Sequence, residues 1–261
     1  MIAQDLILLS PDLLGISSII LFLLLMGVSY LGVRKQGGSE ISARSLRDIP
    51  AYKSLRHAVF QAIETGKRVH LTLGSGGING LRGSTGFAGL VILRQVTKLT
   101  AHSDRPALAT SGDGTLAVLS QDSSHHAFKA ALNEPRYHPT MAHLSGVYPF
   151  AYAAGSLSVI SDHQISTNVL VGHFGSEIAL IADASHGAGC TTIAGTDNLN
   201  AQAITYVLTE DHLVGEEVYV GGAYTQAGLM HLVSIRAQDY FRWIVVVIII
   251  IGAILKFAGL I

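Results

Sequence analysis

The chain has 261 residues, of which 49% are hydrophobic and 13% are charged, and its formal net charge is −1 at pH 7. Soluble domains carry about 25% charged residues, so this composition indicates a membrane component. A net charge near zero excludes a large basic surface, so we expect no nucleic-acid partner. The single cysteine, Cys190, excludes a disulfide framework and is typical of a reducing compartment.

Two apolar segments supply that component. Residues 13–33 contain no charged residue, and residues 243–261 are interrupted only by Lys256. At a rise of about 1.5 Å per residue, each helix would nearly match or exceed a hydrocarbon core of about 30 Å. No basic residue precedes the first segment and no A-x-A site follows it, which favours a retained anchor over a cleaved signal peptide. Both segments are therefore predicted to be transmembrane helices in the lipid bilayer.

The basic residues next to the two spans all lie in the segment between them. They follow the first span and precede the second, at Arg34, Lys35, Arg44, Arg47, Arg236 and Arg242. Because Lys and Arg collect on the cytoplasmic side, the domain between the spans is predicted to be cytoplasmic. The protein is then a two-pass protein of the inner (cytoplasmic) membrane, with residues 1–12 as a short outer N-terminus and both termini outside.

The predicted cytoplasmic part consists of a linker at 34–50 and a domain at 51–242. A helix is expected at 51–65, ended by Gly66. Five short apolar runs follow, namely VHLTL, PALAT, TMAHL, TNVLV and TTIAG, and each leads through a loop of small residues into a stretch of helical length. Those stretches are 84–100, 113–132, 147–161, 176–186 and 197–209. This alternation predicts an α/β fold with a Rossmann-like parallel sheet of about five strands and flanking helices.

All the strand-to-helix loops of a parallel sheet lie at the carboxyl ends of the strands, where α/β proteins bind ligands. The candidate ligand-binding residues in these loops are Gly74, Ser75, Gly76, Gly77, Ser111, Asp113, Ser145, Gly172, Ser176, Thr196, Asp197 and Asn198. A structural interpretation stays open beside this one. Tight turns need glycine, and Asp113, Ser176, Thr196 and Asp197 are residue types that cap helix N-termini.

The stretch GSGGING has the spacing G-x-G-x-x-x-G, which differs from the dinucleotide pattern G-x-G-x-x-G. Its backbone amides could still hold an anion, and Asp113 is placed where a ribose-binding carboxylate would sit. The sequence contains no P-loop, no G-x-S-x-G, no H-E-x-x-H and no C-x-x-C. We therefore assign no catalytic residue, no metal ligand and no cofactor, and the balance is against an enzyme.

Several motifs together carry a family resemblance: SGDGTLAVLSQD, YPFAYAAG, NVLVGHFGSEIALIADA, AGTDNLNAQAI, LVGEEVYVGGAY and AQDYFRW. This series, across most of 66–243, resembles a family of bacterial membrane proteins classed as a domain of unknown function. The resemblance implies a membrane-anchored protein, and it implies no activity or catalytic residue.

Two functional hypotheses follow. The first is a membrane-anchored scaffold that assembles with copies of itself. Small residues on the spans (Gly27, Ser29, Gly32, Gly252 and Ala253) and the apolar segment LVGEEVYVGGAYTQAGL favour it, although the small residues would equally pack the two spans of one chain together. The alternative is binding of a nucleotide or another anionic small molecule at the glycine-rich strand ends, by a sensor or a slow enzyme.

Lys256 lies inside the second span, about 20 Å along the helix from Arg242. One interpretation is that its amine snorkels to the outer headgroups. The other is an intramembrane ion pair with Asp12, which begins the first span on the same side. The absence of proline from residues 229–255 also predicts one continuous helix that leads into the membrane.

Overall fold

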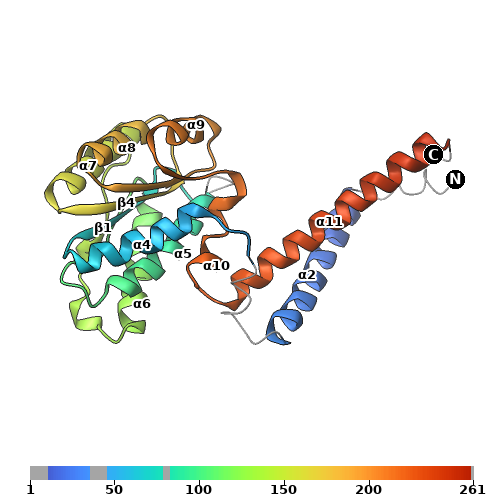
Figure 1. Cartoon of the computed structure of the whole chain (residues 1–261), viewed down its shortest axis with the longest axis horizontal. Coiled ribbons are helices and arrows are strands. Elements are labelled where there is room, and N and C mark those ends of the chain that lie inside the picture. Colours follow the sequence, from blue (N-terminus) through green and yellow to red (C-terminus); the bar gives the residue numbers. More distant parts are fainter. Residues whose placement is uncertain (1–10, 36–45, 79–82, 260–261) are drawn as a thin grey trace. The chain divides into compact units, whose positions relative to one another are not determined.

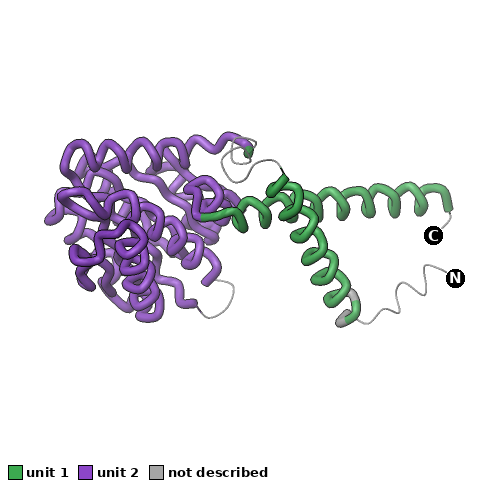
Figure 2. The backbone as a smooth tube through the Cα atoms, turned by 90° about the horizontal axis from the view of Figure 1, so that it is seen from below, with its two compact units in different colours: residues 1–46, 228–261 green, residues 47–227 purple. Residues whose placement is uncertain are grey.

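The computed structural model describes residues 11–35, 46–78 and 83–259. The chain divides into two compact units (Figure 2): residues 47–227, called the α/β unit below, and residues 1–46 with 228–261, called the helical unit.

A six-stranded parallel sheet forms the centre of the α/β unit, in the order β3-β2-β1-β4-β5-β6 (Figure 1). The strands are β1 (Arg68–Gly74), β2 (Leu108–Ser111), β3 (Ala142–Leu144), β4 (Ile165–His173), β5 (Thr191–Gly195) and β6 (Asp211–Leu213). The predicted α/β class and parallel sheet are confirmed, and all five predicted strands are present. The sequence analysis missed β6, because its three residues, Asp211 to Leu213, include only one apolar side chain and so form no apolar run.

Helices cover both faces of the sheet (Figure 1). One face carries α4 (Pro50–Glu64), α5 (Gly83–Thr100) and α6 (Gly114–Ala130), and the other carries α7 (Pro149–Asp162), α8 (Ile178–Gly187) and α9 (Leu199–Leu208). Strand β1 alternates between these layers: Val69, Leu71 and Leu73 belong to the core against α4 and α5. Two cores, one on each face, therefore bury most positions of β1, β2, β4 and β5, whereas the edge strands β3 and β6 are only partly buried.

Local signals explain where several helices begin and end. Proline occupies the first position of α4 and of α7, where its missing N–H costs no hydrogen bond. Gly66, with a φ of 65°, follows the end of α4 as predicted. Asp113 caps α6 by accepting hydrogen bonds from the amides of Thr115 and Leu116.

Three other predicted caps are wrong. Helix α8 begins after Glu177 rather than Ser176, and α9 is capped by Asn198 rather than by Thr196 or Asp197. A turn of a few residues intervenes between each strand and its helix, so each helix starts later than the polar residues suggested. Asp197 is thereby free to make a different contact.

The segment after β6 packs onto the α/β unit itself. It contains a 3-10 turn, η3 (Gly215–Val218), and the short helix α10 (Gly221–Tyr224), in which the first three residues are buried. The ring of Tyr224 stacks on Tyr52 of α4 with centroids 4.9 Å apart. Much of the apolar segment LVGEEVYVGGAYTQAGL is thus covered within one chain. Its apolar composition is therefore a weaker argument for self-assembly than the sequence alone suggested.

The helical unit contains α2 (Pro11–Lys35) and α11 (Leu229–Phe257). By length and composition, both are long and apolar enough to cross a membrane. The two helices pack together, with the Phe22 ring edge-on to that of Phe241 at 6.5 Å between centroids. Helix α11 is continuous, as the absence of proline predicted. The Asp12 side chain lies outside the described residues, so its pairing with Lys256 stays a prediction.

Candidate functional site

The order of the sheet reverses between β1 and β4. From β1 the chain moves outward through β2 to β3, and it then returns to β4 on the other side of β1. The loops that follow β1 and β4 therefore leave in opposite directions and lie side by side at the carboxyl edge. In open α/β sheets, ligands bind at such a switch point.

The glycine loop after β1 is held against the end of β4. The amides of Ser75 and Gly76 both donate to the carbonyl oxygen of His173, at 2.9 and 3.3 Å. The Gly74 amide donates to the buried hydroxyl of Tyr152 at 3.1 Å. Gly74 has a φ of 81°, and a Cβ there would lie 2.3 Å from the His173 oxygen. The loop is a tight turn in which three amides are occupied by the protein itself.

His173, the last residue of β4, forms an oriented pair with Asp197. Its Nδ1 lies 2.7 Å from Asp197 Oδ1, and both side chains are about four-fifths buried. A carboxylate only accepts hydrogen bonds, so Nδ1 carries the hydrogen and Nε2 of the neutral ring is an acceptor. The His173 ring lies against the glycine loop, because a Cβ on Gly76 would be 3.0 Å from its Cδ2. The ring is thus held in one orientation beside the loop.

The buried carboxylate of Glu177 also holds the glycine loop through hydrogen bonds. Glu177 is 2% exposed, and its Oε1 accepts hydrogen bonds from Ser75 Oγ at 2.8 Å and from the Gly175 amide at 2.9 Å. These bonds connect the β1 loop to the β4 loop across the switch point. Ser75 therefore donates its hydroxyl hydrogen to Glu177 and has a structural partner.

Asp113 contributes a second carboxylate on the β2 side of the glycine loop. Its Oδ1 accepts the two capping hydrogen bonds of α6, each 3.0 Å long. Its Oδ2 faces the loop, since a Cβ on Gly77 would lie 3.4 Å from that oxygen. One oxygen of Asp113 therefore serves the helix and the other faces the switch point.

Most of the other candidate ligand-binding residues make contacts within the protein itself. Thr196 is buried, and its Oγ1 accepts from the Phe174 amide, while Asn198 donates to the Phe174 carbonyl at 2.8 Å. Gly172 lies inside β4 in close backbone contact with β1. The Ser145 amide, just after β3, donates to the Ser111 carbonyl at the end of β2, and Ser176 is exposed on the turn before α8.

The sequence analysis missed His173, Glu177 and Tyr152. The first two belong to GHFGSE, which follows a buried strand, so the rule that selected Gly172 and Ser176 would also have selected them. Nothing local marks Tyr152 on α7, whose hydroxyl reaches the glycine loop only in the folded chain. Burial raises the pKa of Tyr152, so this hydroxyl stays neutral and holds the Gly74 amide.

One protein family matches residues 13–260 of the chain, a range that includes the whole sheet and nearly all of both long helices. The chain belongs to the family described as Domain of unknown function (DUF6754). No curated protein and no solved structure matches it. Within residues 11–35, 46–78 and 83–259, no three His, Cys, Asp or Glu side chains come together as metal ligands. For this DUF6754 chain, function is therefore argued from the geometry of the switch point.

Proposed function

We propose that this chain is a membrane-anchored domain that binds a small ligand of the nucleoside type at the carboxyl edge between β1 and β4. The observation that carries the proposal is the His173–Asp197 pair at the switch point. It presents an oriented imidazole on one side of the glycine loop, and Asp113 Oδ2 faces the loop from the other side. Oriented acceptors of this kind select a ligand that donates hydrogen bonds.

The charges of the site favour hydroxyl groups over phosphate. Three carboxylates, those of Asp113, Glu177 and Asp197, belong to this edge, and they would repel an anion. The amides of Ser75 and Gly76 already donate to His173, so they do not cradle a phosphate. A ribose diol instead supplies two donors, which suit Asp113 Oδ2 and His173 Nε2. Recognition in this proposal depends on the nucleoside part of a ligand.

Two further parts of the proposal concern the membrane. Helices α2 and α11 are the anchors, which their length and apolar composition support. The α/β unit lies on the cytoplasmic side in this proposal, and the basic residues that flank the two helices, for example Arg34 and Arg242, support that side.

Calorimetric titration of the full chain in lipid nanodiscs with adenosine, AMP and ATP tests the ligand class. We expect adenosine to bind and Asp113→Asn to weaken its binding at least about tenfold, as the loss of a hydrogen bond to a charged acceptor implies. Asparagine keeps an oxygen that can cap α6, so the helix stays intact. Asp122→Asn removes an exposed carboxylate from the same helix and should leave adenosine binding unchanged.

Two results would contradict this assignment. Binding of AMP and ATP without adenosine would show recognition of phosphate, and binding of none of the three would show that the nucleoside class is wrong. His173→Gln serves as a second variant, because it removes the imidazole acceptor on the other side of the glycine loop. It too should weaken adenosine binding.

Self-assembly is a second candidate function, and the outer face of α9 favours it. Leu199, Tyr206 and Val207 are 79%, 66% and 80% exposed, and a shallow apolar hollow lies among Ala203, Ile204 and their neighbours. Clustered exposed apolar side chains mark interaction surfaces in soluble domains. A second copy of the chain would cover this face.

Mass photometry of the full chain in nanodiscs tests this face. We expect the wild type to form oligomers and Val207→Lys to shift the particles to monomer mass, because a buried unpaired ammonium opposes association. Asn200→Lys adds the same charge at an exposed, polar position of α9 and should keep the oligomer. A monomeric wild type would exclude assembly through α9.

A further inference from the structure

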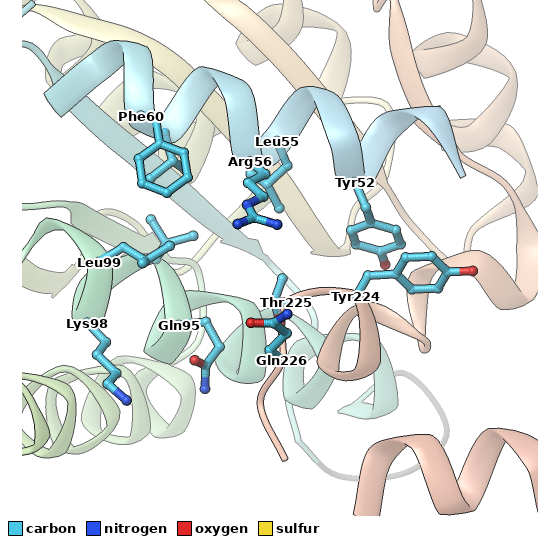
Figure 3. Close-up of a pocket in the computed structure, with 12 residues that line it drawn as sticks. Tyr52, Leu55, Arg56, Phe60, Gln95, Lys98, Leu99, Tyr224, Thr225 and Gln226 are labelled. Carbon is cyan, nitrogen blue, oxygen red and sulfur yellow. The ribbon is translucent and has the colours of Figure 1, made fainter. Parts of the chain in front are cut away.

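A pocket of about 380 Å³ lies in the α/β unit among α4, α5 and the end of α10 (Figure 3). None of the switch-point residues described above lines it. Its lining consists of Tyr52, Leu55, Arg56, Val59, Phe60, Gln95, Val96, Lys98, Leu99, Tyr224, Thr225 and Gln226. The volume is within the range of about 300–1,000 Å³ that is typical of small-molecule sites.

The lining combines an apolar interior with a polar opening. Leu55, Val59 and Val96 are buried, whereas Phe60 and Leu99 remain 41% and 47% exposed where α4 and α5 face each other. Figure 3 shows the Phe60 ring and the Leu99 side chain directed toward one another across the space between the helices. Exposed apolar groups beside a cavity favour a ligand with a hydrocarbon part.

The charge of the lining has one sign. Among the described residues that line the pocket, Arg56 on α4 and Lys98 on α5 are the only charged ones, and none is a carboxylate. In the described part of the chain, neither of them forms an ion pair, and the Arg56 guanidinium lies 5.9 Å from the centroid of the Phe60 ring. Two cations beside an apolar pocket complement a ligand whose polar end is an anion.

We infer that this pocket binds a single-chain amphiphile with an anionic headgroup, and that the ligand is a free fatty acid. Its carboxylate contacts Arg56, Lys98 adds a second positive charge to the lining, and its hydrocarbon chain lies against the exposed Phe60 and Leu99, above the buried Leu55, Val59 and Val96. The pocket is a compact hollow, which suits one acyl chain better than an extended peptide. The two apolar helices that could cross a membrane also suit this ligand, because a bilayer dissolves fatty acids. The inference is independent of the nucleoside proposal.

Photocrosslinking of the full chain in nanodiscs with a twelve-carbon fatty acid bearing a terminal diazirine tests the site. We expect adducts on α4 peptides around Leu55 to Phe60 and on α5 peptides around Gln95 to Leu99. The double variant Arg56→Gln/Lys98→Gln should reduce these adducts at least fivefold. Adducts on α2 and α11 should be unchanged, which reports that the amount of probe in the bilayer is the same.

Two controls separate the site from general effects of charge and folding. Lys53→Gln/Lys129→Gln removes two exposed positive charges outside the pocket and should leave the adducts unchanged. Leu99→Trp fills the opening at a half-exposed position and should abolish the adducts without removing a charge. The alkylation rate of Cys190 reports whether each variant is folded, since this thiol is half-buried.

Three results would overturn the inference. Labelling confined to α2 and α11 would mean that the probe only samples the bilayer. Equal labelling by the corresponding diazirine alcohol would exclude recognition of an anion. Labelling of the pocket by a diazirine phosphatidylglycerol but not by the fatty acid would assign the pocket to a two-chain lipid.

Discussion

Replacement of Gly172 by alanine is expected to lower the free energy of unfolding of the α/β unit by about 3 kcal/mol or more. A Cβ at this position would lie 2.0 Å from the Leu73 carbonyl oxygen and 2.9 Å from the Gly74 amide nitrogen. These are backbone atoms of β1, so no side chain can move aside to relieve the clash. The methyl group fits only if β1 and β4 separate, and their contact forms the switch point.

The only cysteine supplies the readout for this variant. Cys190 is half-buried, its thiol donates to the Ile165 carbonyl at the start of β4, and burial raises the pKa of the thiol. It should therefore react slowly with a maleimide until the unit unfolds. Pulsed alkylation of the full chain in increasing urea then gives the unfolding midpoint.

Gly187→Ala is the matched control. Gly187 is the last residue of α8, and nothing lies within 4 Å of the Cβ it would gain. Alanine is the better helix former by about 0.5–1 kcal/mol, so this variant should be neutral or slightly stabilised. Equal midpoints for the two variants would show that β1 and β4 do not approach as closely as described.

Acidification from pH 7 to pH 4 is expected to lower the free energy of unfolding of the wild type. The decrease should be about 3 kcal/mol larger than the decrease for the variant His70→Gln. His70 lies on β1 and is fully buried, with its Nε2 3.0 Å from Thr110 Oγ1. Burial foremost, and then the nearby His143, lowers the pKa of His70 from 6.5 to about 3. The folded state therefore holds this imidazole neutral.

The sign follows from the two protonation states. Between pH 6.5 and pH 3 the unfolded chain binds a proton at His70 and the folded chain does not, so protons favour unfolding. The stabilisation is complete above pH 6.5 and is lost progressively as the pH falls through about 3. Urea titrations followed by far-ultraviolet circular dichroism at several pH values measure it. Parallel profiles for the wild type and His70→Gln would contradict a neutral buried His70.

Local patterns were sufficient for much of the architecture. The apolar runs, the helix lengths and the glycine after α4 are properties of neighbouring residues, so the sequence predicts five of the six strands and all five helices between them. The carboxyl-edge location of the candidate loops follows from the parallel sheet alone. The two long apolar helices follow equally directly from composition and length.

By itself, the sequence determined the alternation of strands and helices, because burial imposes a periodicity that neighbouring residues reveal. Only the tertiary structure decided the order of the strands and, with it, the partners of the polar residues. Ser75 meets Glu177 across 102 residues because β4 pairs with β1, and His173 meets Asp197 across 24 because β5 pairs with β4. The pocket between α4 and α5 likewise joins residues from Tyr52 to Gln226. Such contacts depend on strand order and register, which the pattern within a single strand does not encode.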